Sequence, residues 1–440
     1  MGNKKLLIIG GSLFILAIIL IMLIIIFKGI GGSVNVGSAS LEFWGVFDEK
    51  EYYQGAIESF NAKYPGVKIT YKGFTYEEYE TQLVNAFAAG RGPDIWLLHN
   101  TWLPRHKDKI LPLPEEIQKD KEMPMTPEDF KDQFVDVTEK DLLSDGQIYA
   151  LPIYVDTLAL FYNRDLFNTN GITQPPKTWE EVNSITEKIT KIDQDNNINQ
   201  SSIAMGTAEN INRSTDIVSL LMLQSGVPLA SDDQSGVNFS AFVDGKNVGQ
   251  AALEYYTDFA NPRKRIFTWN DQMPYSVDAF REGNTAMMLN YSHQIKILRE
   301  QSPRLNFDIA SMPQVSGSRE SINYANYWAP TVSKNSKNPT EAWKFLVHLS
   351  SKDGAISYIN SSNRPPARND LIDLVRNDPD LGVFSVQALS AKSWYQIDNK
   401  IIEKILAQMI NDVNFGRRSI KDALDYAGSQ INILMTNRNF

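Results

Sequence analysis

An aromatic ring and a carboxylate lie close together near the first apolar segment of the chain, residues 41–44. Trp44 ends this segment, and Asp48 follows it after a short loop. A tryptophan presents a flat apolar face and an ionised aspartate accepts hydrogen bonds, so the two could bind the C–H face and the hydroxyls of a polyhydroxylated solute. The structural alternative places Trp44 in the core and Asp48 at the cap of the next helix.

A second group of polar and aromatic residues follows the apolar run 95–98. His99, Asn100 and Trp102 come directly after this run, where a strand is expected to end. Loops at the carboxyl ends of strands are where α/β folds bind ligands, so these three side chains would extend the wall that Trp44 begins. A satisfied surface imidazole at His99 and a tryptophan that covers the core at Trp102 are the alternatives.

Further candidates lie in the second half of the chain. Asn290 and Tyr291 end the strand-like run 286–289 and would face the first wall, with core packing as the alternative. Arg364, in the sequence NRPPAR, could bind a carboxylate or a hydroxyl. A structural salt bridge is an equal alternative for this arginine.

The elements that must position these residues alternate between strand and helix. Strands show alternating or continuous apolar residues, and helices show apolar residues three and four positions apart. These patterns predict a strand, helix, strand, helix and strand at residues 41–44, 49–64, 67–71, 76–89 and 95–98. This order favours a mostly parallel sheet covered by helices, with ligands at the carboxyl ends of its strands.

The rest of the chain continues the α/β pattern. A strand and three helices are predicted at residues 150–162, 178–192, 217–225 and 248–259. The polar run 193–197 suggests a calcium loop, but Ile198 stands where that loop needs glycine and Ala204 where it needs glutamate. A plain turn is therefore favoured there.

Composition excludes several classes of protein. A chain of 440 residues exceeds the usual size of one core, so two lobes are expected. The formal charge of -9 offers no basic surface for nucleic acid. Because there is no cysteine, disulfides, thiolate metal sites, a cysteine nucleophile and a lipid-bearing cysteine are excluded. We expect no cofactor and no metal, and a monomeric body.

The N-terminal segment 6–27 carries no charge and is long enough, at about 1.5 Å per residue, to span a hydrocarbon core of about 30 Å. Two lysines before it favour a cytoplasmic N-terminus and a body outside the cytoplasm. We expect residues 1–28 to be a retained single-pass anchor in the cell membrane, with cleavage near 38–40 as the alternative. Residues 29–40, rich in Gly and Ser, are expected to form a flexible linker.

Several motifs, spread in order over residues 41–435, together resemble the family 1 extracellular solute-binding proteins, which include maltose-binding protein and many oligosaccharide receptors. They are 60–67 (FNAKYPGV), 88–95 (AAGRGPDI), 145–152 (DGQIYALP), 160–167 (LFYNRDLF), 175–181 (PPKTWEE), 280–288 (FREGNTAMM) and 336–346 (SKNPTEAWKFL). None is decisive alone, but their order and spacing are specific.

The resemblance implies an α/β periplasmic-binding-protein-like fold, in which two lobes joined by three crossings close around a small solute, such as a carbohydrate. By analogy the first lobe takes 41–153 and 325–370, and the second takes 154–324 and 371–440. ABC permease subunits are the implied partners. Many relatives carry a lipid-bearing cysteine that this chain lacks, so the segment 6–27 would have to anchor it.

The resemblance also implies site residues. Asp156 lies in the segment YVDTLAL, which resembles the first crossing and carries an acidic ligand-binding residue in related sugar receptors. A hinge hydrogen bond to the backbone is its alternative. Tyr327 and Trp328 lie where the chain returns to the first lobe and could sandwich a sugar ring, and Trp394 resembles a late tryptophan that stacks on sugar in several members. Core packing is the alternative for all three.

Two other functions use a similar cleft. An exported carbohydrate-active enzyme such as a glycosidase needs two carboxylates about 5 to 9.5 Å apart, and Asp48 with Asp156 could form such a pair. The sequence carries no nucleophile elbow, zinc-protease motif or phosphate loop. A surface sensor or adhesion receptor without transport is the third alternative.

Overall fold

The structure is a computed structural model that describes residues 37–231 and 234–436. The predicted anchor 6–27 lies outside these residues, as does most of the predicted linker. Within the described part of the chain, no helix is both long enough and apolar enough to cross a membrane. The first strand begins at Ala39, inside the segment expected to be linker.

The first sheet contains the predicted β-α-β-α-β unit. Its strand order is β15-β3-β1-β2, with β1 parallel to both β2 and β3, and β15 antiparallel to β3. Its strands are β1 (Ala39–Val46), β2 (Val67–Phe74), β3 (Ile95–His99) and β15 (Trp328–Val332). The helices around it are α2 (Lys50–Lys63), α3 (Tyr76–Ala88), α4 (Leu103–His106), α5 (Glu115–Gln118), α6 (Pro127–Gln133), α7 (Asp136–Leu142), α14 (Pro339–Ser350), α15 (Lys352–Ser362) and α16 (Asn369–Val375).

The second sheet has the order β13-β7-β12-β9-β8. Its central strand β12 runs antiparallel to β7 and parallel to β9. Its strands are β7 (Ala159–Asn163), β8 (Lys191–Ile192), β9 (Ile198–Ile203), β12 (Thr285–Asn290) and β13 (Phe307–Ala310). The helices around it are α8 (Arg164–Thr169), α9 (Trp179–Ile189), α10 (Ser214–Gln224), α11 (Val248–Asp258), α12 (Ser276–Arg281), α13 (Gln294–Gln301), α18 (Asn399–Asn414) and α19 (Ile420–Thr436).

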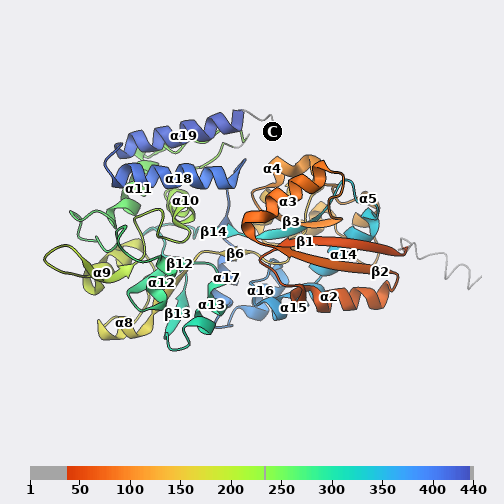
Figure 1. Cartoon of the computed structure of the whole chain (residues 1–440), viewed down its shortest axis with the longest axis horizontal. Helices are drawn as coiled ribbons and strands as arrows, with labels where there is room; N and C mark the ends of the chain where they lie inside the picture. The colour runs from red at the N-terminus through yellow and green to blue at the C-terminus, as the bar shows by residue number, and fades with distance from the viewer. Residues whose placement is uncertain (1–36, 232–233, 437–440) are drawn as a thin grey trace, which may run out of the picture.

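A short three-stranded sheet joins the two halves. It contains β6 (Asp156–Thr157), β14 (Asn323–Asn326) and β16 (Ala391–Lys392) in the order β16-β14-β6. Figure 1 shows β6 and β14 between the two larger sheets, with α18 and α19 along one side of the second. The chain therefore passes between the halves at these strands.

Each half has its own hydrophobic core, and we call the halves the first and second lobes. Buried apolar residues up to Val155 pack in the first core, and those from Leu158 onward pack in the second. Packing in the first core resumes at Ala325. Leu371 and Ile372, which the expected division gives to the second lobe, pack in the first core. Helix α17 (Gly382–Ala388) contributes to both cores. The lobe boundaries named from the sequence stay a prediction.

One predicted strand is wrong in part. The run 150–162 forms only β6 and β7, and residues 150–155 form no ladder. Pro152 has no amide hydrogen to donate, and the only β contact of this stretch is an isolated bridge from Tyr154 to Pro366. The polar run 193–197 is a turn, as predicted, in which the Asp193 carboxylate accepts hydrogen bonds from the amides of Asp195 and Asn197.

Candidate functional site

A cavity of about 470 Å³ lies between the two lobes. The first lobe contributes the loop after β1, the start of β15 and the loop after α15, and the second contributes the loop after β12, helix α13 and the residue before α10. The short sheet between the lobes contributes β6. The residues used below are Phe47, Tyr154, Asp156, Arg213, Tyr291, Ser292, His293, Lys296, Trp328 and Arg364.

Arg364 is held at the cavity by a buried acidic partner. Its Nη2 lies 3.1 Å from Oδ1 of Asp48, and its guanidinium lies 4.6 Å from the ring centroid of Tyr154. The other oxygen of Asp48 accepts hydrogen bonds from the hydroxyls of Tyr53 at 2.5 Å and Tyr358 at 2.8 Å. Asp48 does not line the cavity, so the sequence-based pairing of Asp48 with Asp156 as two catalytic carboxylates is not supported by this geometry.

Asp156 lines the cavity from β6 and also joins β6 to the second lobe. Its carboxylate accepts hydrogen bonds from the amide of Thr157 at 2.9 Å and from the Ser292 hydroxyl at 2.7 Å, and the Ser292 amide lies 3.1 Å from Oδ2. Burial raises the pKa of Asp156 to about 6, against the bonds from Ser292 and the charge of Arg364, which lower it. The hinge bond considered as its alternative is therefore present, and the residue still faces the cavity.

Aromatic rings form part of the wall. Trp328 packs edge to face, at centroid distances of 4.9 Å, against both His99 and Trp102. Tyr291 donates a hydrogen bond from its hydroxyl to Asp216 at 2.7 Å. Phe47 is 53% exposed and offers a further apolar surface at the rim. The cavity therefore combines rings with the charged groups of both lobes.

Several predicted residues lie behind this wall. His99 is buried, and burial lowers the pKa of its imidazole to about 3, so the surface-imidazole alternative is wrong. Asn290 is buried at the end of β12, where its Oδ1 accepts a bond from the Tyr291 amide at 2.9 Å. Trp44 is buried against Phe74, at 4.7 Å between ring centroids. None of these three lines the cavity.

Three other predicted residues lie around a second cavity of about 850 Å³. Asn100 and Trp394 line it, together with Asp141. The carboxylate of Asp141 accepts hydrogen bonds from the hydroxyl of Tyr327 at 2.8 Å and from Nδ2 of Asn100 at 3.1 Å. The structure therefore separates Asn100, Tyr327 and Trp394 from Asp156, Tyr291, Trp328 and Arg364.

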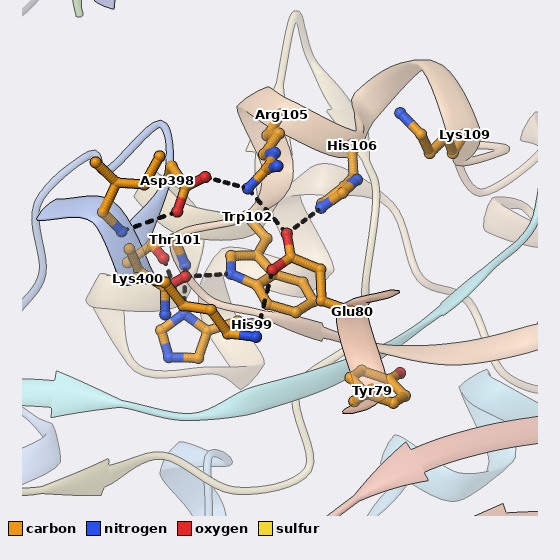
Figure 2. A network of polar contacts seen from close by, with 12 residues as sticks. Tyr79, Glu80, His99, Thr101, Trp102, Arg105, His106, Lys109, Asp398 and Lys400 are labelled. Carbon is orange, nitrogen blue, oxygen red and sulfur yellow. Dashed lines mark hydrogen bonds and ion pairs between the residues drawn. The ribbon is translucent and has the colours of Figure 1, made fainter. Parts of the chain in front are cut away.

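A polar network connects the lobes near the first cavity, and we call it the interlobe network (Figure 2). Arg105 of α4 pairs with Glu80 of α3 at 2.9 Å and with Asp398, the N-cap of α18, at 2.7 Å. The indole nitrogen of Trp102 donates to Oδ1 of Asn399 at 2.9 Å. Trp102 therefore acts as a contact between the lobes, behind the cavity wall.

Sequence reasoning missed several charged or titratable residues of the cavity, among them Arg213 and His293. Arg213 follows no predicted strand, whereas His293 lies four positions after the predicted strand 286–289, as Trp102 does after 95–98. Neither residue lies in a recognised motif. The predicted helix began at residue 217, so only the structure shows that Arg213 is the N-cap of α10, a position where Ser, Thr, Asp or Asn is usual. Burial lowers the pKa of His293 to about 3, and the charges of Arg213 and Arg364 lower it further.

Comparisons with known proteins agree with this architecture. The sn-glycerol-3-phosphate-binding periplasmic protein UgpB of Salmonella typhimurium is 22% identical over 401 residues, which cover 86% of this chain and 88% of the relative. The sugar-binding protein MalE of Xanthomonas citri matches with a TM-score of 0.73 at 22% identity, over 91% of this chain and 98% of that one. A solute-binding protein of Thermotoga lettingae bound to alpha-D-tagatose matches with a TM-score of 0.70 at 23% identity, over 90% and 100%.

The two solved structures share the two-lobed α/β fold with this chain. The family model described as bacterial extracellular solute-binding protein matches residues 45–356, which is more than half of the sequence. Those residues include β2, β3 and β15 of the first sheet, all of the second sheet, and β6 and β14 of the joining sheet, whereas most of β1 lies before them and β16 lies after them. The chain therefore belongs to the bacterial extracellular solute-binding protein family.

Proposed function

We propose that this receptor binds a sugar, an oligosaccharide or a related polyol in the first cavity and delivers it to an ABC importer. The observation that carries this proposal is that one cavity takes rings and hydrogen-bonding groups from both lobes: Trp328 and Arg364 from the first, Tyr291 from the second, and Asp156 from the joining sheet. Rings pack on the C–H faces of sugars, and carboxylate and guanidinium groups bind their hydroxyls.

The twelve residues singled out from the sequence would then have different roles. Direct contact with the solute is proposed for Asp156, Tyr291, Trp328 and Arg364, which line the cavity. Positioning is proposed for residues in contact with that group or with the interlobe network, namely Asp48, His99, Trp102 and Asn290. The remaining four, Trp44, Asn100, Tyr327 and Trp394, are proposed to act in packing or around the second cavity.

Names of relatives support the same class of solute. The Salmonella relative is named for sn-glycerol-3-phosphate, and the Xanthomonas structure is titled a sugar-binding protein. Both solutes are hydroxylated carbon compounds, which suits a cavity of about 470 Å³.

Lobe closure is the proposed mechanism of capture. A solute in the cavity touches both lobes only when they meet, so binding favours the closed arrangement. Small-angle scattering of the purified protein, with and without the solute identified by mass spectrometry of co-purified material, tests this. We expect a smaller radius of gyration with solute, and an unchanged radius at saturating, calorimetrically confirmed binding would contradict closure.

We also propose that residues 6–27 remain attached as a single-pass membrane anchor, with the body outside the cytoplasm and monomeric. The uncharged segment is long enough to span a bilayer, and the chain has no cysteine to carry a lipid. Fractionation and intact-mass analysis of the native protein should find the full chain in the membrane fraction. A soluble species that begins near residue 39 would contradict the anchor and leave the binding function intact.

A further inference from the structure

Arg213 differs from the other cationic groups of the first cavity, because it has no ion-pair partner among the residues that the structure describes. Arg364 is paired with Asp48 at 3.1 Å, and Lys296 lies 3.9 Å from Glu49. Arg213 forms no salt bridge with any described residue, and its Nε is buried without a hydrogen-bond partner. The guanidinium instead makes a cation–π contact with the Tyr291 ring, whose centroid lies 5.4 Å from the guanidinium carbon.

Arg213 lines the cavity and has an unusual backbone conformation. Its φ is 65°, in the left-handed region that residues with a side chain seldom adopt. Arg213 is also the N-cap of α10 and makes no side-chain capping bond. Strained residues of this kind cluster at ligand clamps, where the surrounding structure holds them in place. The end of α10, which carries partial positive charge, therefore borders the same cavity.

Nearby carboxylates do not neutralise Arg213 fully. Burial raises the pKa of Glu403 to about 7 and the charge of Asp216 raises it further, so Glu403 is only partly ionised at neutral pH. Burial also raises the pKa of Asp216, and this carboxylate already accepts the Tyr291 hydroxyl. Burial lowers the pKa of His293, and the charges of Arg213 and Arg364 lower it further, which places both guanidinium groups near this imidazole.

We infer that the solute of this receptor carries an anionic group, a carboxylate or a phosphate on a hydroxylated carbon skeleton, and that Arg213 binds this group. The inference rests on the proposed function and narrows its solute class. The planar guanidinium matches the two oxygens of a carboxylate or phosphate and forms paired charge-assisted hydrogen bonds with them. A neutral hydroxyl could accept a hydrogen bond from Arg213 but would bring no negative charge to its half-buried guanidinium.

Mass spectrometry of the solute released from the gently purified full-length chain is the first test. An acidic sugar or a phosphorylated polyol is expected. A neutral sugar would overturn the inference and leave the proposed function standing, whereas a solute without hydroxyl groups would contradict the proposed function itself.

Calorimetry on the full-length chain is the second test, with matched pairs of probes: glucose with glucuronate, glucose with glucose 6-phosphate, and glycerol with glycerol 3-phosphate, together with the released solute. We expect the acidic member of at least one pair to bind about ten- to a hundredfold more tightly than its neutral partner, the range for hydrogen bonds to charged groups. The uronate and phosphate pairs distinguish the two sources of the anion.

Variants test whether Arg213 causes the preference for the acidic member of a pair. Arg213→Gln removes the charge and shortens the side chain but retains a hydrogen-bonding amide, so it should lower affinity for the acidic member much more than for the neutral member and abolish the preference. Arg213→Lys should restore part of it, because the charge returns without the planar fork. Arg265→Gln, an exposed arginine of the same lobe, is the control. Equal affinity for both members of every pair, or a preference unchanged in Arg213→Gln, overturns the inference.

Discussion

Arg105 and Asp398 form an ion pair of 2.7 Å that connects α4 of the first lobe to the start of α18 in the second. The side chains are partly buried, at 25% and 14% exposure. Asp398 also caps α18 by accepting a hydrogen bond from the Ile401 amide at 3.1 Å. The pair therefore contributes to the arrangement of the two lobes seen here, and separation of the lobes would break it.

Replacement of Asp398 by Asn should shift the lobes toward an open arrangement. Asn retains the helix cap but loses the charge that pairs with Arg105. We expect solute affinity to fall about fivefold, from a loss of about 1 kcal/mol for a pair of this exposure. Calorimetry measures the affinity and scattering the radius of gyration, with Asp271→Asn, an exposed aspartate, as the control. An unchanged affinity in both variants would show that the pair does not favour closure.

Removal of the Asp156 carboxylate should weaken solute binding. Asp156→Ala is expected to lower affinity about ten- to a hundredfold, because hydrogen bonds to a charged acceptor contribute about 1.5 to 3 kcal/mol. Because the pKa of Asp156 is raised to about 6, wild-type affinity should also fall as pH drops below 6 and the carboxylate becomes protonated. In Asp156→Asn this part of the pH dependence should disappear. Equal affinity with an intact fold would leave Asp156 with its hinge role alone.

Asp141 should make the fold less stable as pH rises. Burial raises its pKa from 3.8 to about 6 in the folded protein, so the folded state keeps its proton after the unfolded state has lost it. Between about pH 4 and pH 6, the free energy of unfolding should therefore fall, by up to about 3 kcal/mol from this group. Urea unfolding of the wild type and Asp141→Asn across this window isolates the effect. Parallel pH profiles in the two proteins would contradict it.

Among the eight tryptophans, solute binding should change the fluorescence of Trp328 most, because it lines the first cavity. Trp328→Phe should remove most of the signal and also weaken binding, since the smaller ring covers less of the solute. Trp44→Phe, a buried tryptophan away from the cavity, is the matched control and should retain the signal. A full signal in Trp328→Phe would contradict the proposal that this ring contacts the solute.

Much of the first lobe follows from local sequence patterns. The predicted helices 49–64 and 76–89 are α2 and α3, and the predicted strands 67–71 and 95–98 lie within β2 and β3. These segments were predicted correctly because each helix buries one face and each strand is buried on one face or on both. Such burial requires apolar residues at regular positions, and this spacing is visible in the sequence. The strand at 150–162 was predicted less accurately, because residues 150–155 are buried in a segment that forms no ladder, whereas the rest of the run forms β6 and β7.

The residues of the site could be predicted only in part. Asp156 and Trp328 were found from the resemblance, and Tyr291 from its place after a strand; all three line the first cavity. Asn100 was predicted by the same rule as Tyr291 but lines the second cavity. Strand ends indicate which edge of a sheet a residue occupies, but they do not indicate toward which cavity its side chain points.

By itself, the sequence determined the α/β class, the first β-α-β-α-β unit, the absence of thiol chemistry and the family, because these depend on composition, local periodicity and ordered motifs. Only the tertiary structure decided that Arg364 is held by Asp48 and that Arg213 forms no ion pair with any residue of the described ranges. The physical reason is distance along the chain. Charges far apart in sequence meet only when the core that brings their segments together has formed, and no local pattern records which of them will find a partner.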